Sequence, residues 1–387
     1  MAIDKKDFDL MQQGQMTDVL KKELHMLTAF QSSLGSRLTP IGDNFFGLNH
    51  RMMPGRLPMN KDVQGLTFFT RPDLNFSTDN LVSLRKFNPL LTENANSLQR
   101  IIRCYLDPDL QSGQGRFYLG SNPNAGAGRT EPIITTTLVD QNQAFIPILT
   151  NTLISLSGWP DLEVPTYTSK AGFYGEEMFF ADGIFDYNRK FSLTANFRNI
   201  AGDPINALFY YWCAYQSAVF EGTLVPKMDN LAAFRIDYNT RIYQLIMDQS
   251  KTQVRGIAAC GAAMPTVSPL GAKFNYDRDK PYNMASDEIS MSFECVGAMY
   301  MDEILIREFN NTTVMFNPSM NGSKIESTMT KIPITALGLF NNKGYPRINE
   351  STYELEWWVF KEDYVVLKPY MDVGEGDIPA PEFEEGD

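Results

Sequence analysis

Hydrophobic and polar residues alternate over Lys190–Asn199 and again over Glu288–Gly297. This period of two is typical of strands with one buried face, because successive side chains of a strand point to opposite sides. The apolar positions are Phe191, Leu193, Ala195 and Phe197 in the first segment, and Ile289, Met291, Phe293 and Cys295 in the second. The pattern therefore predicts two half-buried strands.

Between these strands the apolar residues change to helical spacing. Asp203 and Pro204 make a favourable N-cap and first helical residue, and no charged residue occurs between Asp203 and Glu221. A helix without charges is expected to be buried almost all round. The other elements predicted here are two short strands and a Pro/Gly-rich connection, at Phe234–Tyr238, Arg241–Asp248 and Gly261–Gly271.

The N-terminal part of the chain is predicted to hold a helix over Met1–Leu34, followed by a turn-rich extended arm. Leu66–Thr70 is predicted to be a short strand. A turn follows at Arg71–Asp73, because the proline between them has no N–H and biases Arg71 away from helix. Ser97–Cys104 is predicted to be helical, and the Gly/Asn/Ser-rich stretch Asp107–Arg129 to be a surface loop.

The C-terminal part of the chain is predicted to be strand and loop, with strands at Thr312–Phe316, Ile332–Phe340 and Tyr353–Phe360. The last of these holds Trp357 and Trp358, which must face opposite ways on a strand. We expect one of them in the core and the other at a subunit interface. Residues 372–387 hold seven acids and no base, which predicts a disordered tail or one that orders on a basic partner.

Composition limits the function classes. The chain has 387 residues, enough for two or three domains, and a net charge of −12. That charge argues against a general duplex-DNA binder, which needs a basic surface, but it permits a DNA conduit whose wall repels the polymer. The sequence shows neither a signal peptide nor an apolar run of membrane-spanning length, so no membrane association is expected.

Catalytic and metal-binding patterns are weak in this sequence. The only histidines are His25 and His50, and nothing around a serine resembles a nucleophile elbow. The four cysteines are dispersed without CxxC spacing, which predicts buried thiols in a reducing compartment and no zinc site. The best paired carboxylates, Asp182 with Asp186 and Glu176 with Glu177, lie beside turns and are interpreted as surface charge. We therefore expect no enzyme, no cofactor and no metal.

Several short phrases follow one another in the order Phe-Ser-Leu-Thr-Ala-Asn-Phe (191–197), Asp-Pro-Ile (203–205), Ile-Asp-Tyr (236–238), Pro-Leu-Gly-Ala (269–272) and Ile-Ser-Met-Ser-Phe-Glu-Cys-Val-Gly-Ala (289–298). This order resembles the tube-type domain of contractile-tailed bacteriophages. The resemblance covers about a third of the chain. It implies an α+β, mainly β fold, in which an antiparallel β-sandwich with a flanking helix forms hexameric rings that stack into a tube.

Five regions follow from this interpretation. Residues 1–64 are a helical and extended arm, 65–175 an accessory α/β segment with long loops, and 176–310 the tube-like sandwich. Residues 311–371 add strands that complete or extend the sandwich, and 372–387 form the acidic tail. Because the chain is longer than a minimal tube subunit, we expect a specialised ring that continues or initiates the tail tube at the baseplate.

Three alternatives stay open at this point. The chain could be a neck or collar ring protein, a tail-terminator ring protein, or a glycan-binding or glycan-cleaving tail protein. The expected partners of a ring are further copies of the chain, tail tube, baseplate hub or neck proteins, and DNA that passes without specific binding. The expected location is the virion tail, after assembly in the host cytoplasm.

The interpretation also nominates individual residues. The phrase Gly65–Asn75 resembles structural proteins of large myoviruses, which implies an Arg71–Asp73 contact across a subunit seam; the alternative is a strand and turn that merely begin a domain. Trp357 and Trp358 are the other possible interface residues. Glu288 and Glu294 are possible lumen-facing residues, since they lie on the polar face of a predicted strand.

Overall fold

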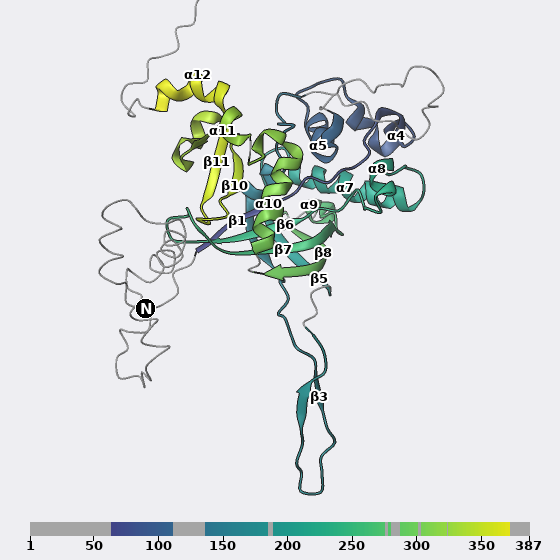
Figure 1. Cartoon of the computed structure of the whole chain (residues 1–387). Coiled ribbons are helices and arrows are strands. Elements are labelled where there is room, and N and C mark those ends of the chain that lie inside the picture. The colour runs from purple at the N-terminus through teal and green to yellow at the C-terminus, as the bar shows by residue number, and fades with distance from the viewer. Residues whose placement is uncertain are drawn as a thin grey trace, which may run out of the picture. The chain divides into compact units, whose positions relative to one another are not determined.

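The computed structural model describes residues 63–110, 136–184, 189–274, 278–279, 287–300, 303–322 and 324–371. The predicted N-terminal helix and arm, most of the predicted loop that ends at Arg129, and the acidic tail lie outside these residues, as do both histidines and Asp186. The described residues combine helices and strands (Figure 1), which confirms the predicted α+β class.

Most long strands belong to one six-stranded sheet with the order β1-β6-β7-β8-β5-β2. The pairs β2–β5, β5–β8 and β7–β8 are antiparallel. The strand bounds are β1 Val63–Phe69, β2 Leu153–Ser157, β5 Lys190–Arg198, β6 Ile242–Met247, β7 Val254–Pro265 and β8 Glu288–Tyr300. Two short strands, β3 (Thr166–Thr168) and β4 (Phe179–Ala181), pair with each other in a separate hairpin.

Strands β5 and β8 confirm the alternation that the sequence predicted. Leu193, Ala195 and Phe197 of β5 are fully buried, and so are the apolar positions of β8 that pair with them. The register sets Leu193 opposite Phe293 and Phe197 opposite Ile289. The polar residues between these positions lie on the opposite face of the strand pair, as expected for a period of two.

Helix α7 (Pro204–Phe220) packs on the apolar face of these strands. The ring centroid of Phe209 lies 5.8 Å from that of Phe197 and 5.8 Å from that of Phe293. Trp212 is fully buried, and its Nε1 donates to the carbonyl oxygen of Tyr238 at 2.9 Å. Only Ser217 and Phe220 of this helix are exposed, which confirms the predicted burial for all but its last turn.

Shorter helices surround this core. They are α4 Thr78–Val82, α5 Leu98–Leu106, α6 Pro147–Thr152, α8 Met228–Ala232 and α9 Leu270–Lys273, with 3-10 helices η2 at Arg85–Leu91 and η3 at Pro108–Leu110. The predicted helix at Ser97–Cys104 is confirmed by α5, whose N-cap Ser97 accepts a hydrogen bond from the backbone N–H of Arg100 at 3.2 Å. Such a cap satisfies an amide that the first helical turn leaves unpaired.

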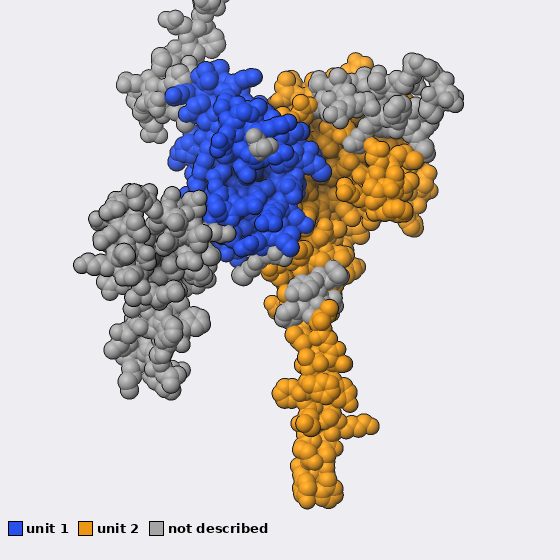
Figure 2. All heavy atoms as spheres, in the orientation of Figure 1, with its two compact units in different colours: residues 1–66, 245–257, 302–387 blue, residues 67–244, 258–301 orange. Residues whose placement is uncertain are grey.

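The chain divides into two compact units (Figure 2). One consists of Met1–Leu66, Leu245–Ile257 and Asp302–Asp387, and the other of Thr67–Gln244 and Ala258–Met301. Among the described residues, none of the helices has the length and apolar character required to cross a bilayer.

The first unit contains a three-stranded antiparallel sheet with the order β10-β11-β9. Asn310 binds this sheet in both directions, since its side-chain amide donates to the carbonyl of Ile348 at 2.8 Å and its Oδ1 accepts from the N–H of Ile348 at 2.9 Å. The element bounds are α10 Glu303–Phe316, η5 Pro318–Met320, α11 Ile325–Thr328, β9 Met329–Ile332, η6 Ile334–Phe340, β10 Tyr345–Ile348, β11 Leu355–Phe360 and α12 Lys361–Met371.

The strand predicted at Thr312–Phe316 is wrong, because these residues end helix α10. The helix is amphipathic, with Leu305, Phe309 and Thr313 buried at helical spacing. The hydroxyls of Thr312 and Thr313 bond to carbonyl oxygens four residues earlier, at 2.8 and 3.3 Å. This local bonding accommodates the β-branched residues whose composition suggested a strand.

Three further element predictions need correction. The strand predicted at Phe234–Tyr238 is a turn, in which Phe234 adopts a left-handed conformation with φ of 55°. The strand predicted at Ile332–Phe340 is the last residue of β9 followed by a 3-10 helix, because Pro333 supplies no N–H to extend the ladder. The connection predicted at Gly261–Gly271 begins only after β7 ends at Pro265.

Candidate functional site

The polar face of β5 and β8 is the first surface with a functional interpretation. The register sets Ser192 opposite Glu294, Thr194 opposite Ser292, Asn196 opposite Ser290 and Arg198 opposite Glu288. The hydroxyl oxygens of Ser192 and Ser292 lie 3.1 Å apart, and the amide of Asn196 donates to Ser155 of β2 at 3.0 Å. The face is therefore a continuous strip of small polar groups across three strands.

Charges on this strip balance one another. Lys190 Nζ lies 3.0 Å from a carboxylate oxygen of Glu294, and Arg198 is the register partner of Glu288. The glutamates predicted to face a lumen thus lie on a polar face, with Glu288 exposed and Glu294 half-buried in its ion pair. The strip provides weak, non-specific polar contacts, because paired side chains present little net field.

The β3–β4 hairpin, residues 161–184, is the second surface. Figure 1 shows it as a long two-stranded arm between β2 and β5. Its apolar side chains are exposed to an unusual degree: Phe173 is 93% exposed and Tyr174 90%. The other exposed apolar residues of the hairpin are Val164, Tyr167, Met178, Phe179, Phe180 and Ile184. A cluster of large exposed apolar side chains is typical of a protein interaction site.

The root of the hairpin is packed, in contrast to its tip. The Trp159 ring lies 5.9 Å from Phe191 and 6.0 Å from Tyr300, between centroids, and its Nε1 donates to Gln244 at 2.8 Å. Tyr300 donates its hydroxyl to the carbonyl of Pro160 at 2.5 Å. The arm is therefore anchored at its base, so that its exposed side chains are presented from an ordered support.

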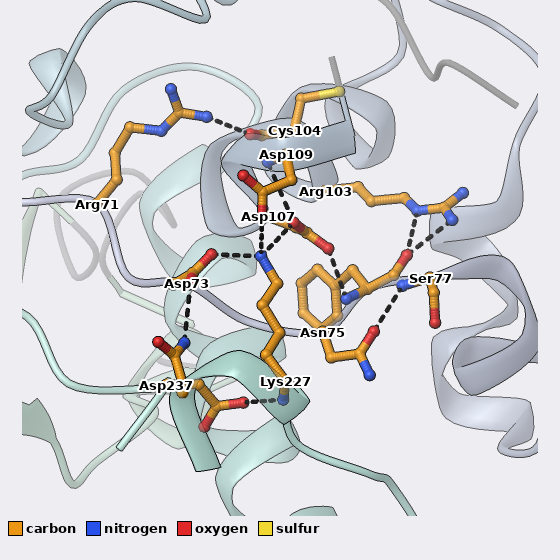
Figure 3. A network of polar contacts seen from close by, with 12 residues as sticks. Arg71, Asp73, Asn75, Ser77, Arg103, Cys104, Asp107, Asp109, Lys227 and Asp237 are labelled. Carbon is orange, nitrogen blue, oxygen red and sulfur yellow. Dashed lines mark hydrogen bonds and ion pairs between the residues drawn. The ribbon is translucent and has the colours of Figure 1, made fainter. Parts of the chain in front are cut away.

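A buried ionic network is the third feature (Figure 3). The ammonium of Lys227 lies 2.8 Å from Asp107 and 2.7 Å from Asp109, and it also pairs with Asp73. Lys227 and Asp107 are almost completely buried. The three carboxylates come from two separate segments of the chain, so the lysine joins both of them to the start of α8.

Tyr215 and Asp237 extend this network. The Tyr215 hydroxyl donates to the Asp237 carboxylate and accepts from the backbone N–H of Asn75 at 3.2 Å. Burial raises the pKa of the Asp237 carboxyl above its ordinary value, against the opposing effect of hydrogen bonds from Tyr215 and from the backbone N–H of Lys227. Burial likewise raises the pKa of Tyr215, and the adjacent Asp237 raises it further, so the phenol stays neutral.

Arg71 binds the backbone around this network. Its guanidinium donates to the carbonyl oxygens of Cys104 at 2.6 Å, Tyr105 at 3.1 Å and Gln143 at 3.2 Å. Burial lowers the pKa of Arg71 to about 10, so the side chain still carries its charge at neutral pH. The residue thus ties the segment after β1 to two other segments by satisfying their carbonyls. The turn predicted at Arg71–Asp73 is wrong, because the backbone N–H groups of both residues bond to distant segments, at Ala144 and Asp237.

The four residues nominated as interface residues, Arg71, Asp73, Trp357 and Trp358, all contact other residues of their own chain. Arg71 is buried, and Asp73 is half-buried against Lys227. Trp358 is buried in one apolar cluster with Tyr345, whereas Trp357 is half-buried beside a second cluster. The two tryptophans therefore face opposite sides of β11, as alternation predicted. A role of these four residues between subunits stays a prediction.

The described part of the chain offers one group of carboxylates with metal-site spacing, namely Asp73, Asp107 and Asp109. Lys227 already lies among them and supplies the positive charge that a metal would bring. Glu176 and Glu177 lie on the exposed hairpin, where Glu176 accepts from the backbone N–H of Tyr174 at 2.8 Å. These carboxylates therefore make structural contacts or belong to an open surface.

Sequence reasoning missed the hairpin and the ionic network. The hairpin had a usable signal, because Phe173, Tyr174, Phe179 and Phe180 are dense aromatics flanked by acids around Gly175. The network had none, since Asp107 and Lys227 are separated by 120 positions. Only the fold brings these two residues together.

Solved structures of contractile injection systems share limited similarity with the chain. A chain of the sheath–tube complex of an extracellular contractile injection system (PVC) matches at 14% identity and a TM-score of 0.23, covering 41% of this chain and 82% of its own. The tube-terminating cap of the anti-feeding prophage matches at 16% identity and a TM-score of 0.24, covering 41% and 81%. No curated protein matches the sequence.

A family model gives much broader coverage. The family described as "Putative phage tail tube protein" matches residues 12–371, which is nearly the whole chain. Tail tube proteins are structural components of the phage tail and are not enzymes. This match agrees with the resemblance noted over residues 191–298. The chain belongs to the phage tail tube protein family.

Proposed function

We propose that this chain assembles with further copies of itself into a ring that continues or initiates the tail tube of a contractile phage tail. Six copies per ring are the number that the tube resemblance implies. The ring encloses a conduit through which DNA passes without specific binding. Its place is the virion tail, and assembly takes place in the host cytoplasm.

The single observation that carries the proposal is the two-faced character of β5 and β8. One face is apolar and covered by α7, and the other is a strip of small polar residues and matched charges. A conduit wall needs groups that stay hydrated and do not hold a polyanion. The Lys190–Glu294 pair meets this need, because a paired lysine offers less attraction to phosphate than a free one.

The hairpin supports the self-associating part of the proposal. An isolated two-stranded hairpin is marginally stable in water, and this one exposes five large aromatic rings. At roughly 150–250 Å² for each aromatic side chain, these rings supply most of the about 800 Å² that each partner contributes to a standard interface. Burial against a neighbouring copy would cover them.

The position within the tail is proposed from length and from the additional unit. Besides the unit that holds β5, β8 and α7, the chain carries the first unit, which has its own three-stranded sheet, β10-β11-β9. A repeating tube subunit has no need of such an addition, whereas a ring that joins the tube to a different structure needs a second binding surface. We place this ring at the baseplate end, next to hub proteins. A neck or terminator ring is the competing position.

The test measures assembly directly. The purified full-length chain is examined by light scattering and negative-stain imaging, alone and with tube protein from the same phage. Rings that nucleate tubes support the initiator position. Rings that instead stop the growth of preformed tubes favour the terminator position. A chain that stays monomeric and joins no tube overturns the proposal, and binding and hydrolysis of surface glycans would then be measured.

A matched variant pair tests the conduit face. Lys190 and Glu294 are exchanged for each other in one variant, and Glu294→Lys alone is made in the second. The exchange keeps the charge balance of the strip, whereas the single change adds two positive units per subunit. Rings of the single variant are expected to retain DNA at low salt and release it at high salt, while the exchange variant behaves as wild type. Equal DNA retention by both variants contradicts a lumen position for this face.

A further inference from the structure

The end of α8 and the turn after it expose a second group of large apolar side chains. Phe234 is 98% exposed, and Leu231 and Ile236 are each more than half exposed. We call these three residues the turn surface. Among the described residues, no ring contact or hydrogen bond joins them to the β3–β4 hairpin. The second unit of the chain therefore exposes two separate apolar surfaces.

The backbone of the turn surface is strained at Phe234, which suggests that the exposed side chain of this residue has a function. Phe234 has φ of 55°, in the left-handed region that bulky side chains rarely adopt. Glycine or asparagine would occupy this position at lower cost. An exposed phenylalanine in a strained conformation gives no advantage to an isolated subunit. Such outliers persist where the side chain is required.

The turn is supported from beneath by the buried ionic network. The side-chain amide of Asn230 donates to the Asp73 carboxylate at 2.8 Å. The backbone carbonyl of Asn230 accepts from the backbone N–H of Arg235 at 2.8 Å. Lys227, three residues earlier, pairs with the same Asp73. The support holds the start of α8 and the turn together, so Phe234 is presented on an ordered base. An anchor that is already ordered loses little entropy when it binds.

We propose that the turn surface receives the β3–β4 hairpin of a second copy of this chain. This inference rests on the proposed self-assembly and names the two surfaces that carry it. The hairpin provides Phe173, Tyr174 and Phe179 at its exposed end. The turn surface provides a comparable set of exposed apolar side chains, so each would cover the other. Both sets belong to the same unit, so every copy can insert its hairpin into one neighbour and receive the hairpin of another neighbour on its turn surface.

Charge favours the same pairing. The hairpin carries five acids and one base over residues 161–184. Arg235 is exposed between Phe234 and Ile236 and forms no ion pair with another described residue. Glu177 is exposed beside the hairpin aromatics and forms no ion pair within the described part of the chain either. An Arg235–Glu177 pair at the rim of an apolar contact would set orientation more than affinity.

A contact between two different surfaces has a consequence for assembly. Such a heterologous contact repeats from copy to copy, and it closes into a ring or continues into a stack. A contact of one surface with itself would end at a dimer. The proposed pairing therefore provides the kind of interface that a ring or a tube requires.

The first test uses Phe234→Gly in the full-length chain, with Lys251→Gly as its matched control. Lys251 is also exposed and left-handed, with φ of 57°, but it is not aromatic and lies outside the turn surface. Both variants remove the same kind of backbone strain, so both monomers are expected to melt at or above the wild-type temperature. Only Phe234→Gly is expected to weaken association, by about 30-fold in Kd, the effect of a hot-spot aromatic.

The second test exchanges charge. Arg235→Glu and Glu177→Arg are each expected to slow assembly, and the double variant is expected to recover it. Assembly is followed by mass photometry across subunit concentrations. The recovery requires the two residues to meet, so independent effects of the two changes overturn the pairing.

A third variant separates this inference from the proposed function. If Phe179→Ser abolishes rings while Phe234→Gly assembles as wild type, the chain self-assembles through its hairpin but the turn surface does not receive it. If neither variant changes the rings, both surfaces are excluded and another interface carries assembly. A wild-type chain that is monomeric at every concentration overturns the proposed function together with this inference.

Discussion

The ammonium of Lys227 lies 2.8 Å from a carboxylate oxygen of Asp107, and neither side chain reaches solvent. Asp109 and Asp73 complete the group, and Asp107 also accepts from the backbone N–H of Phe76 at 2.9 Å. Burying these charges is costly, and the pairing and hydrogen bonds offset that cost. The network therefore holds together segments that are far apart in sequence.

Lys227→Met is expected to destabilise the chain by ~3–5 kcal/mol, because it leaves the Asp107 carboxylate buried without its counter-charge. Methionine keeps the length and apolar stem of lysine, so lost packing contributes little. The free energy of unfolding is measured by urea denaturation with two spectroscopic probes.

Lys190→Met is the control for this change. Lys190 also pairs with a glutamate, at 3.0 Å, but most of its side chain is exposed. Exposed pairs contribute roughly 0–1 kcal/mol. Equal losses for Lys227→Met and Lys190→Met would contradict the structural role of the buried network.

Asp237 gives a prediction for pH. Because burial raises the pKa of its carboxyl in the folded chain, the folded state binds a proton more readily than the unfolded state. The stability linked to this proton is fully present below the unfolded pKa of about 3.9. It is lost as pH rises through the raised folded pKa.

Asp237→Asn removes this pH-dependent loss of stability, because asparagine does not titrate. The side-chain oxygen of asparagine can still accept the hydrogen bond from Tyr215. The variant is therefore expected to lose less stability than wild type as pH rises from about 4 to 7. Urea denaturation of both proteins across that range checks it. Parallel curves would show that Asp237 titrates alike in the folded and unfolded states.

The half-buried strands and the uncharged helix could be predicted because local pattern and final environment agree there. In β5 and α7 every apolar position that the period selects is packed against the same cluster. The residues Phe197, Phe209 and Phe293 meet because each lies on the face that its own periodicity defines. Binary pattern is sufficient where one side of an element is buried.

Other parts could not be predicted for identifiable reasons. Thr312 and Thr313 favour strand by type, but their hydroxyls bond within α10, an outcome that depends on the buried face of the whole helix. Phe234 lies in an apolar run whose left-handed turn is fixed by contacts with Asn230 and Leu231. The Lys227 network depends on distant segments, and no spacing rule points to it.

Trp212→Ala is expected to cost ~3–5 kcal/mol, as truncation of a fully buried large side chain does. Trp212 stacks on Phe209 at 6.1 Å between ring centroids and also loses its hydrogen bond to Tyr238 in this variant. Phe220→Ala is the control on the same helix, since Phe220 is exposed and surface changes are usually within about 0.5 kcal/mol. A loss below about 1 kcal/mol for Trp212→Ala would contradict the packing role of α7.

Gly158 lies at the root of the hairpin and Gly175 at its tip, and substitutions at the two glycines distinguish the effect of a steric clash from that of backbone strain. Both have positive φ, 109° and 78°. A Cβ at Gly158 would lie 2.3 Å from the carbonyl oxygen of Ser192, whereas a Cβ at Gly175 meets nothing within 4 Å. Gly175→Ala is therefore expected to cost only the left-handed strain of roughly 1–2 kcal/mol, and within the local turn.

Gly158→Ala is expected to cost more than Gly175→Ala, because the added methyl group also pushes the hairpin root away from β5. The shift would disturb the packing of Trp159 on Phe191, so near-ultraviolet circular dichroism should change as well. Assembly should weaken, since the aromatic tip would no longer be presented from a fixed base. Equal stability and equal assembly for the two variants would show that the root does not position the arm.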